Sequence, residues 1–175
     1  DSTRAVAALY ERGSHWKKLS KLLVRAAESA PEASRAAILV RLGDLRRVHL
    51  GATAKAVVDY RSALEAESGH PGAIAGLTAL LGDGDAATSA MDVLLADHRA
   101  RDAWRDVLQL QSDRLRIAAD DQARIAILLE AAKLEEDRGL DPAAAFRSCS
   151  DAFVLSRGDI AIDATLARLA AVSDN

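Results

Sequence analysis

An internal repeat constrains the fold of this chain more than any other feature. Residues 38–64, ILVRLGDLRRVHLGATAKAVVDYRSAL, recur 89 positions later as residues 127–153, ILLEAAKLEEDRGLDPAAAFRSCSDAF. The copies align without a gap and share apolar and small residues, whereas their polar residues differ. This pattern is typical of stacked structural repeats, in which each unit buries its apolar face against the next. The matched pairs are Arg35 and Arg124, Ile38 and Ile127, Leu39 and Leu128, Leu45 and Leu134, Ala54 and Ala143, Ala56 and Ala145, Ala63 and Ala152, and Leu77 and Leu166.

The spacing of apolar residues predicts an all-α fold of antiparallel helical hairpins without a sheet. Alanine is abundant, only 3% of residues are aromatic and there are only three prolines, a composition that favours close-packed helices. The breaker Gly82-Asp83-Gly84-Asp85 separates two homologous five-helix units, 1–82 and 85–172, of one helical-repeat domain spanning 1–175. The ten predicted helices cover roughly 2–12, 15–29, 32–49, 52–67, 70–81, 86–99, 102–117, 121–138, 141–156 and 159–171.

The first copy resembles the tetratricopeptide repeat, with degenerate repeats of bacterial type. The match rests on a Leu-Gly pair followed by small and aromatic residues at helical spacing. The resemblance implies hairpins stacked as an α-solenoid with a right-handed superhelix. The sequence departs from the family at Leu39, where Trp is preferred, at Arg46, where Tyr is preferred, and in a turn one residue longer. The residues that carry the match are Leu39, Leu42, Gly43, Gly51, Ala56, Tyr60 and Ala63; in the second copy Ala132 replaces Gly43 and Cys149 replaces Tyr60.

The resemblance also implies a groove lined by the first helix of each hairpin, which would take a partner helix or an extended peptide. Five helices per unit complicate this, because strict alternation would exchange the inner and outer faces of equivalent helices. Either the fifth or the sixth helix packs irregularly, or the two units present different walls. The predicted wall comprises Ala37, Val40, Arg41, Asp44, Arg47 and Val48 in the first copy and Ala126, Leu129, Lys133, Glu136 and Asp137 in the second.

The function expected from this pattern is a non-catalytic scaffold for protein–protein interaction. The alternative is a regulatory or structural region of a larger enzyme, which docks the enzyme's own neighbouring domain. The full-length sequence would separate the two, because a catalytic domain next door favours the second and further repeats favour the first.

Charge is distributed unevenly along the chain. The net charge is −3, but residues 1–69 carry +4 and residues 70–175 carry −7. The stretch 12–47 holds nine Lys and Arg against three acidic residues. It is a solvated face, a nucleic-acid contact or a contact for an acidic protein segment. Nucleic acid is not expected as a partner, because Trp16 is the only aromatic residue in the stretch.

Four polar positions reverse sign between the copies. Two explanations are open: drift on a solvated surface, or opposite potentials that orient a ligand or stack one copy of the chain on another. The reversed pairs are Arg41 and Glu130, Asp44 and Lys133, Arg46 and Glu135, and Arg47 and Glu136.

Motifs for catalysis or metal binding are weak. The four histidines lack the i, i+4 spacing of a helical metal site and lie near predicted helix ends, where they are expected to be caps or surface residues. The calcium-like start at Asp83 lacks its closing acid, since Leu94 stands there. Cys149 is expected in the core, and Ser14 is expected to cap a helix. No enzyme activity, metal or cofactor is predicted.

The compartment is only weakly indicated. One cysteine cannot form an intrachain disulfide, and neither a secretory signal nor an apolar run of about 18 residues occurs. A cytoplasmic location without membrane insertion is therefore expected, and the oligomeric state is open. The chain begins at Asp1 and Met91 is its only methionine, so a processed product or a fragment of a longer protein is expected.

Overall fold

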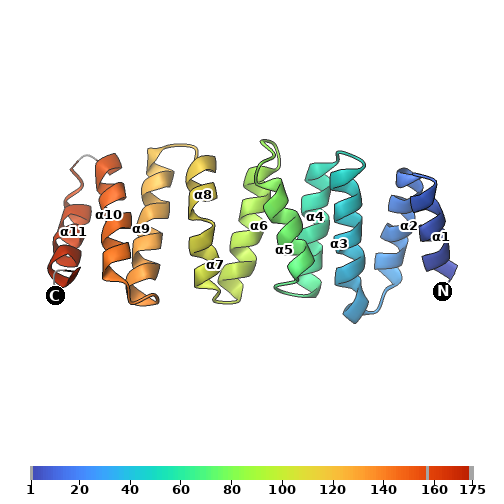
Figure 1. Ribbon diagram of the computed structural model, residues 1–175, viewed down its shortest axis with the longest axis horizontal. Coiled ribbons are helices and arrows are strands. Elements are labelled where there is room, and N and C mark those ends of the chain that lie inside the picture. The colour runs from blue at the N-terminus through green and yellow to red at the C-terminus, as the bar shows by residue number, and fades with distance from the viewer. Residues whose placement is uncertain (1, 157, 174–175) are drawn as a thin grey trace. The chain divides into compact units, whose positions relative to one another are not determined.

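The computed structural model describes residues 2–156 and 158–173, and every regular element in these ranges is an α-helix (Figure 1). The chain divides into two compact units, Asp1–Arg101 and Asp102–Asn175. The helices are α1 (Ser2–Arg12), α2 (Trp16–Ser29), α3 (Glu32–Val48), α4 (Thr53–Ala66), α5 (Pro71–Leu80), α6 (Ala87–Ala100), α7 (Trp104–Gln109), α8 (Gln111–Ile117), α9 (Asp121–Asp137), α10 (Pro142–Ser156) and α11 (Ile160–Ser173).

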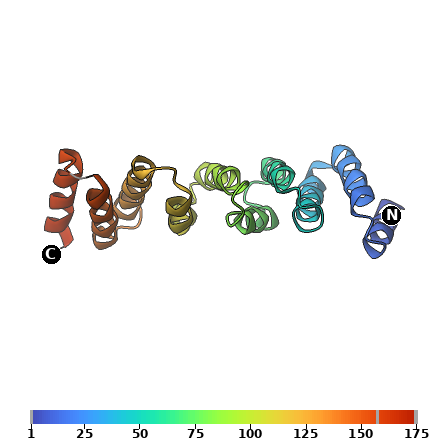
Figure 2. The ribbon, with the colours of Figure 1, turned by 90° about the horizontal axis from the view of Figure 1, so that it is seen from above.

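In the first unit, consecutive helices run in opposite directions and each packs against the next. Helix α3 also contacts α5, and α4 also contacts α6. Figure 2 shows the resulting two layers of this unit, with α1, α3 and α5 in one and α2, α4 and α6 in the other. The repeat copies meet in sequence at 82–85, whereas the compact unit extends to Arg101 because α6 packs on α4 and α5.

In the second unit, α9 is central and packs against α7, α8 and α10, and α10 packs against α11. The predicted helix 102–117 is interrupted at Leu110, so the described chain has eleven helices where about ten were predicted. Leu110 has a ψ of −3°, far from the helical value of about −42°, which breaks the regular backbone ladder there. The other predicted helices agree with the structure to within about two residues.

Several helix starts follow from local chemistry. The side chains of Asp120 and Asp141 accept hydrogen bonds from the backbone N–H groups of Ala123 and Ala144, each at 2.8 Å, which is the usual N-cap contact. His70 precedes Pro71 and accepts from Gly72 N–H at 3.1 Å. The predicted cap at Ser14 is wrong. His15 occupies the N-cap position without a side-chain bond, and Ser14 adopts a φ of +52° in the turn.

The turns repeat as well as the helices. Gly51 and Leu140, which are 89 positions apart, both have left-handed backbones, with φ of +60° and +52°. The next residues, Ala52 and Asp141, donate their N–H groups across the turn to the backbone carbonyls of Arg46 and Glu135, at 2.9 and 3.0 Å. Ser14 and Asp102 form a similar left-handed pair before the two tryptophan-led helices. The repeat is therefore visible in the backbone, with glycine at one of these four positions.

Tyr60 is the largest fully buried side chain of the first unit's core. A Cβ placed on Gly43 would lie 2.6 Å from the Tyr60 ring, and a Cβ on Gly76 would also overlap it. Glycine is therefore needed on α3 and on α5 so that the ring of α4 fits between them. Gly43, Ala56 and Ala63, which carry the repeat pattern, lie where the helices approach closely, and Gly76, which that pattern does not include, lies there too.

The apolar periodicity of the repeat helices places four leucines of α3 and α9 in the core, and three of them are buried. Leu42, Leu45 and Leu128 are buried, but Leu134 is only partly buried. Leu134 lies in the last turn of α9, and part of its side chain is left exposed there. Among the described residues, no helix is long and apolar enough to cross a membrane.

Candidate functional site

The predicted wall is divided between the two compact units, six positions on α3 and five on α9, and the structure defines each set by itself. On α3, Ala37, Arg41 and Val48 are exposed. Val40 is only 9% exposed and lies under α5, close to Gly72, so it offers little surface to a ligand. On α9, Ala126, Lys133 and Asp137 are exposed, while Leu129 packs at the edge of a core cluster and Glu136 is partly covered.

An open hollow of about 280 Å³ lies beside the α3 wall. Arg41, Asp44 and Val48 line one side of it, and Glu11 and Trp16 contribute from α1 and α2. Arg41 forms an ion pair with Glu11, which closes one edge. The hollow is therefore small and ringed by groups that already have partners.

Asp44 and Arg47, two other wall positions, are held by Tyr60. The Tyr60 hydroxyl donates to Asp44 at 2.7 Å and accepts from Arg47 Nε at 3.3 Å. Burial, together with Asp44, raises the pKa of Tyr60 to about 12 against the opposing effect of Arg47, so the phenol is neutral at physiological pH. These two wall residues therefore stabilise the α3–α4 packing as well as facing solvent.

Among the described residues, seven of the eight charged side chains at the reversed positions, all except the exposed Lys133, have a partner within their own unit. Arg46 pairs with Asp59, whereas its equivalent Glu135 accepts a hydrogen bond from Ser148 at 2.8 Å. The remaining pairs are Arg41 with Glu11, Arg47 with Asp44, Glu130 with Arg114, and Glu136 with Arg168. The reversal therefore accompanies a change of local partner, which neither drift on a solvated surface nor a ligand potential requires.

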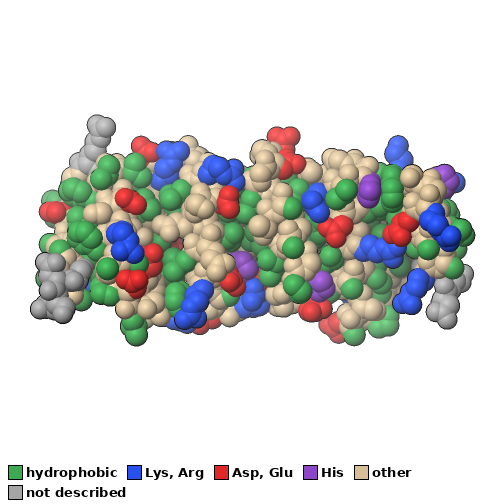
Figure 3. Space-filling model, viewed as in Figure 1, with side chains coloured by type: hydrophobic (Ala, Val, Ile, Leu, Met, Phe, Trp, Pro, Cys, Tyr) green, Lys and Arg blue, Asp and Glu red, His purple; other side chains and the backbone are tan. Residues whose placement is uncertain are grey.

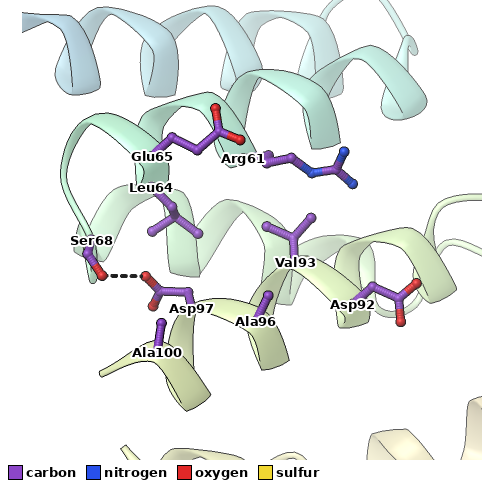
Figure 4. Close-up of a pocket in the computed structure, with 9 residues that line it drawn as sticks. All are labelled: Arg61, Leu64, Glu65, Ser68, Asp92, Val93, Ala96, Asp97 and Ala100. Atoms are coloured by element: carbon purple, nitrogen blue, oxygen red, sulfur yellow. Dashed lines mark hydrogen bonds between the residues drawn. The ribbon is translucent and has the colours of Figure 1, made fainter. Parts of the chain in front are cut away.

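An open groove with an apolar floor lies between α4 and α6 in the first unit, with a volume of about 390 Å³. Figure 4 shows Leu64 from α4 and Val93 from α6 in the space between the helices. Ala96 and Ala100 continue this floor along α6, and both are exposed. The rims are charged: Arg61 and Glu65 lie on the α4 side and Asp92 on the α6 side. We call this surface the α4–α6 groove.

Asp97 closes one end of the α4–α6 groove. Its carboxylate accepts from Ser68 Oγ at 3.0 Å, Gly69 N–H at 2.9 Å and Arg101 Nε at 2.9 Å. Burial favours the protonated acid, but these three donors outweigh it and hold the pKa of Asp97 below its usual range. Asp97 is thus an ionised anchor that ties α6 to the turn between α4 and α5.

Sequence reasoning missed this groove because it depends on the contact between two helices that are separated in sequence by α5. No motif marks it. The available signal was the row of small and apolar residues on α6, with Val93, Ala96 and Ala100 at i, i+3 and i+7.

Other titratable groups show structural roles. His98, expected to be a cap or surface residue, is only 4% exposed in the last turn of α6, because α6 is packed on two neighbouring helices. Burial raises the pKa of the Cys149 thiol, and Cys149 is enclosed in the core as predicted. Within the described ranges, no group of three or more His, Cys, Asp and Glu could hold a metal ion.

The charged residues on the face shown in Figure 3 are interspersed, with Lys and Arg beside Asp and Glu and apolar side chains between them. That face carries no broad area of a single charge sign.

Comparison with protein-family models, with curated proteins and with solved structures found no significant match.

Proposed function

We propose that this chain is a non-catalytic interaction module that binds a partner helix in the α4–α6 groove, within a tetratricopeptide-like superhelix. The observation that carries the proposal is the apolar floor of this groove between charged rims, with Ala96 and Ala100 exposed on it. A partner with an apolar stripe would bury that floor, which is the main favourable term in most protein associations.

The groove has the dimensions of a helix-binding surface. Asp92 and Ala100 lie eight positions apart on α6, so the floor extends about 12 Å at 1.5 Å per residue. That length matches two turns of a partner helix, with anchors at i, i+3 or i+4, and i+7. The small side chains of Ala96 and Ala100 leave space for larger anchors such as Leu or Phe.

The charged rims would set the direction in which a partner helix binds. Arg61, Glu65 and Asp92 make no ion pair within the described part of the chain. An incoming helix with an acid facing Arg61 and a base facing Asp92 would satisfy both, and the reverse orientation would oppose like charges. Such complementarity sets specificity and association rate more than affinity.

The test is affinity capture from lysate of the source organism with three forms of the chain. Ala96→Arg places a long charged side chain on the groove floor, and Ala75→Arg makes the same change at an exposed position in the middle of α5. We expect wild type and Ala75→Arg to retain the same proteins and Ala96→Arg to lose them. Equal capture by all three forms, or none by wild type, would refute the groove as the binding site.

A further inference from the structure

Four basic side chains share one face of α2. Lys17, Lys18, Lys21 and Arg25 fall within an arc of about 100° when the helix is projected down its axis. All four are exposed, and none forms an ion pair with another described residue. We call this set the α2 basic face. The opposite side of the helix, with Leu19, Leu23 and Ala27, is buried.

The second copy of the repeat is an internal control. The corresponding segment, helices α7 and α8, begins at Trp104, 88 positions after Trp16, and it keeps the tryptophan but not the basic charges. The four equivalent residues carry one base and two acids, and one is uncharged. The second copy therefore packs on its neighbouring helix without these cations. The equivalents, in order, are Arg105, Asp106, Gln109 and Asp113.

An open hollow of about 430 Å³ adjoins the basic face, lined by Lys17 and Lys18. Its other walls include Trp16 and His49, whose rings stack at 3.8 Å between centroids with planes 9° apart, and Leu50. In the second copy the equivalent of His49 is Arg138, which forms an ion pair with Asp102, the equivalent of Ser14. The first copy therefore has an aromatic stack at a place where the second has an ion pair.

We propose that the α2 basic face and its adjoining hollow bind an acidic peptide segment, with carboxylates on the four cations and one apolar side chain in the hollow. Charge complementarity carries this choice of partner. The site lies on other helices than the α4–α6 groove and does not depend on the function proposed for that groove.

Two other anionic partners fit the geometry less well. A membrane surface would engage an amphipathic helix through its apolar face, but the apolar face of α2 is buried in the core. A single-stranded nucleic acid would gain affinity by stacking its bases on free aromatic faces, and the ring of Trp16 is already stacked on His49.

A second copy of the chain is also disfavoured as the source of the acids. Its densest acidic stretch is on α9, where Glu130, Glu135 and Glu136 already bond Arg114, Ser148 and Arg168. A separate acidic segment would not have to break these contacts first.

The experiment measures anisotropy of a fluorescein-labelled peptide of Glu and Gly with one central Leu. Lys17→Glu with Lys21→Glu removes two cations from the face, and Lys55→Glu with Lys133→Glu makes the same change in net charge at two other exposed positions. We expect the first pair to weaken binding at least about tenfold at low salt and the second to change it less than about twofold. A Trp104→Phe background leaves Trp16 as the reporter, and its emission should change on binding.

The outcomes are decisive in both directions. Loss of binding confined to the Lys17 and Lys21 variant supports the proposal. Equal binding by both variants, or no binding by wild type, overturns it. Binding to phosphatidylserine vesicles or to oligothymidylate in preference to the peptide also overturns it. If the peptide with Ser in place of Leu binds as tightly, the hollow is not part of the site.

Discussion

Arg46 and Asp59 join α3 to α4 through a partly buried ion pair, in which Nη1 of Arg46 donates to both carboxylate oxygens at 2.6 and 2.8 Å. In the second copy the equivalent positions, Glu135 and Ser148, also touch, through a hydrogen bond of 2.8 Å. The contact is retained, but its chemistry changes. In the first copy a guanidinium donates to a carboxylate, and in the second a neutral hydroxyl donates to a carboxylate. Sign reversal at this position is therefore coupled to the residue it faces.

Stability should depend on pH through Asp59. Burial raises its pKa to about 6, against the lowering effect of Arg46. Because the folded pKa lies above the unfolded value of about 3.9, the native state binds the proton more tightly. This contribution is complete below about pH 4 and is lost as the pH rises through about 6. Urea unfolding between pH 4 and 7 should show wild type losing stability relative to Asp59→Asn as the pH rises. A constant or rising difference would contradict the assignment.

Exchanging the pair between copies tests the coupling. Arg46→Glu alone places two carboxylates against each other and should destabilise the fold by about 3–5 kcal/mol, as when one partner of a buried pair is removed. Adding Asp59→Ser recreates the pair of the second copy and should recover most of that loss. Asp59→Ser alone completes the double-mutant cycle by urea denaturation. Additive losses would show that the two side chains are independent.

Helices and turns were predictable because they depend on local chemistry. Asp120, Asp141 and Pro71 mark helix starts through capping and the fixed φ of proline. Ser14 failed as a cap because the turn before α2 places it in a left-handed backbone and moves His15 into the cap position. Leu110 carries neither glycine nor proline, so nothing local marks the interruption there.

Candidate sites were harder to predict because they depend on which helices touch. The repeat located α3 and its polar positions, but Val40 faces α5, and Asp44 and Arg47 are held by Tyr60. The α4–α6 groove exists only because α6 packs on α4 across the intervening helix. Periodicity shows that a helix has an apolar side, but it does not show how much of that side a neighbour covers.

The equivalent left-handed turn residues Gly51 and Leu140 should respond in opposite ways when each is replaced by the residue of the other copy. Leu140 has a φ of +52° and is 80% exposed, so it bears backbone strain and contributes little packing. Leu140→Gly should raise the free energy of unfolding by up to about 1 kcal/mol, after allowance for the extra chain entropy of glycine. Gly51 has the same conformation and open space around it, so Gly51→Leu should lower the free energy of unfolding by about 1 kcal/mol. Thermal denaturation of both variants would show opposite shifts, and shifts of the same sign would exclude this explanation.

Gly76 should be the glycine least tolerant of alanine in the first unit. Its backbone lies against the ring and hydroxyl of Tyr60, so a Cβ would overlap a side chain that is fully buried and held by Asp44 and Arg47. The ring cannot withdraw without losing those bonds, so Gly76→Ala should cost about 1–3 kcal/mol despite the better helix propensity of alanine. Gly82→Ala is the matched control, because nothing lies within 4 Å of its Cβ position. If the urea midpoints of both variants fall by the same amount, the tight fit of Tyr60 is not what makes glycine necessary.

Combining Tyr60→Phe with Gly76→Ala separates the effect of side-chain volume from that of hydrogen bonding, since the hydroxyl and the ring edge of Tyr60 both face this glycine. Partial rescue by the phenylalanine variant would locate the overlap at the hydroxyl.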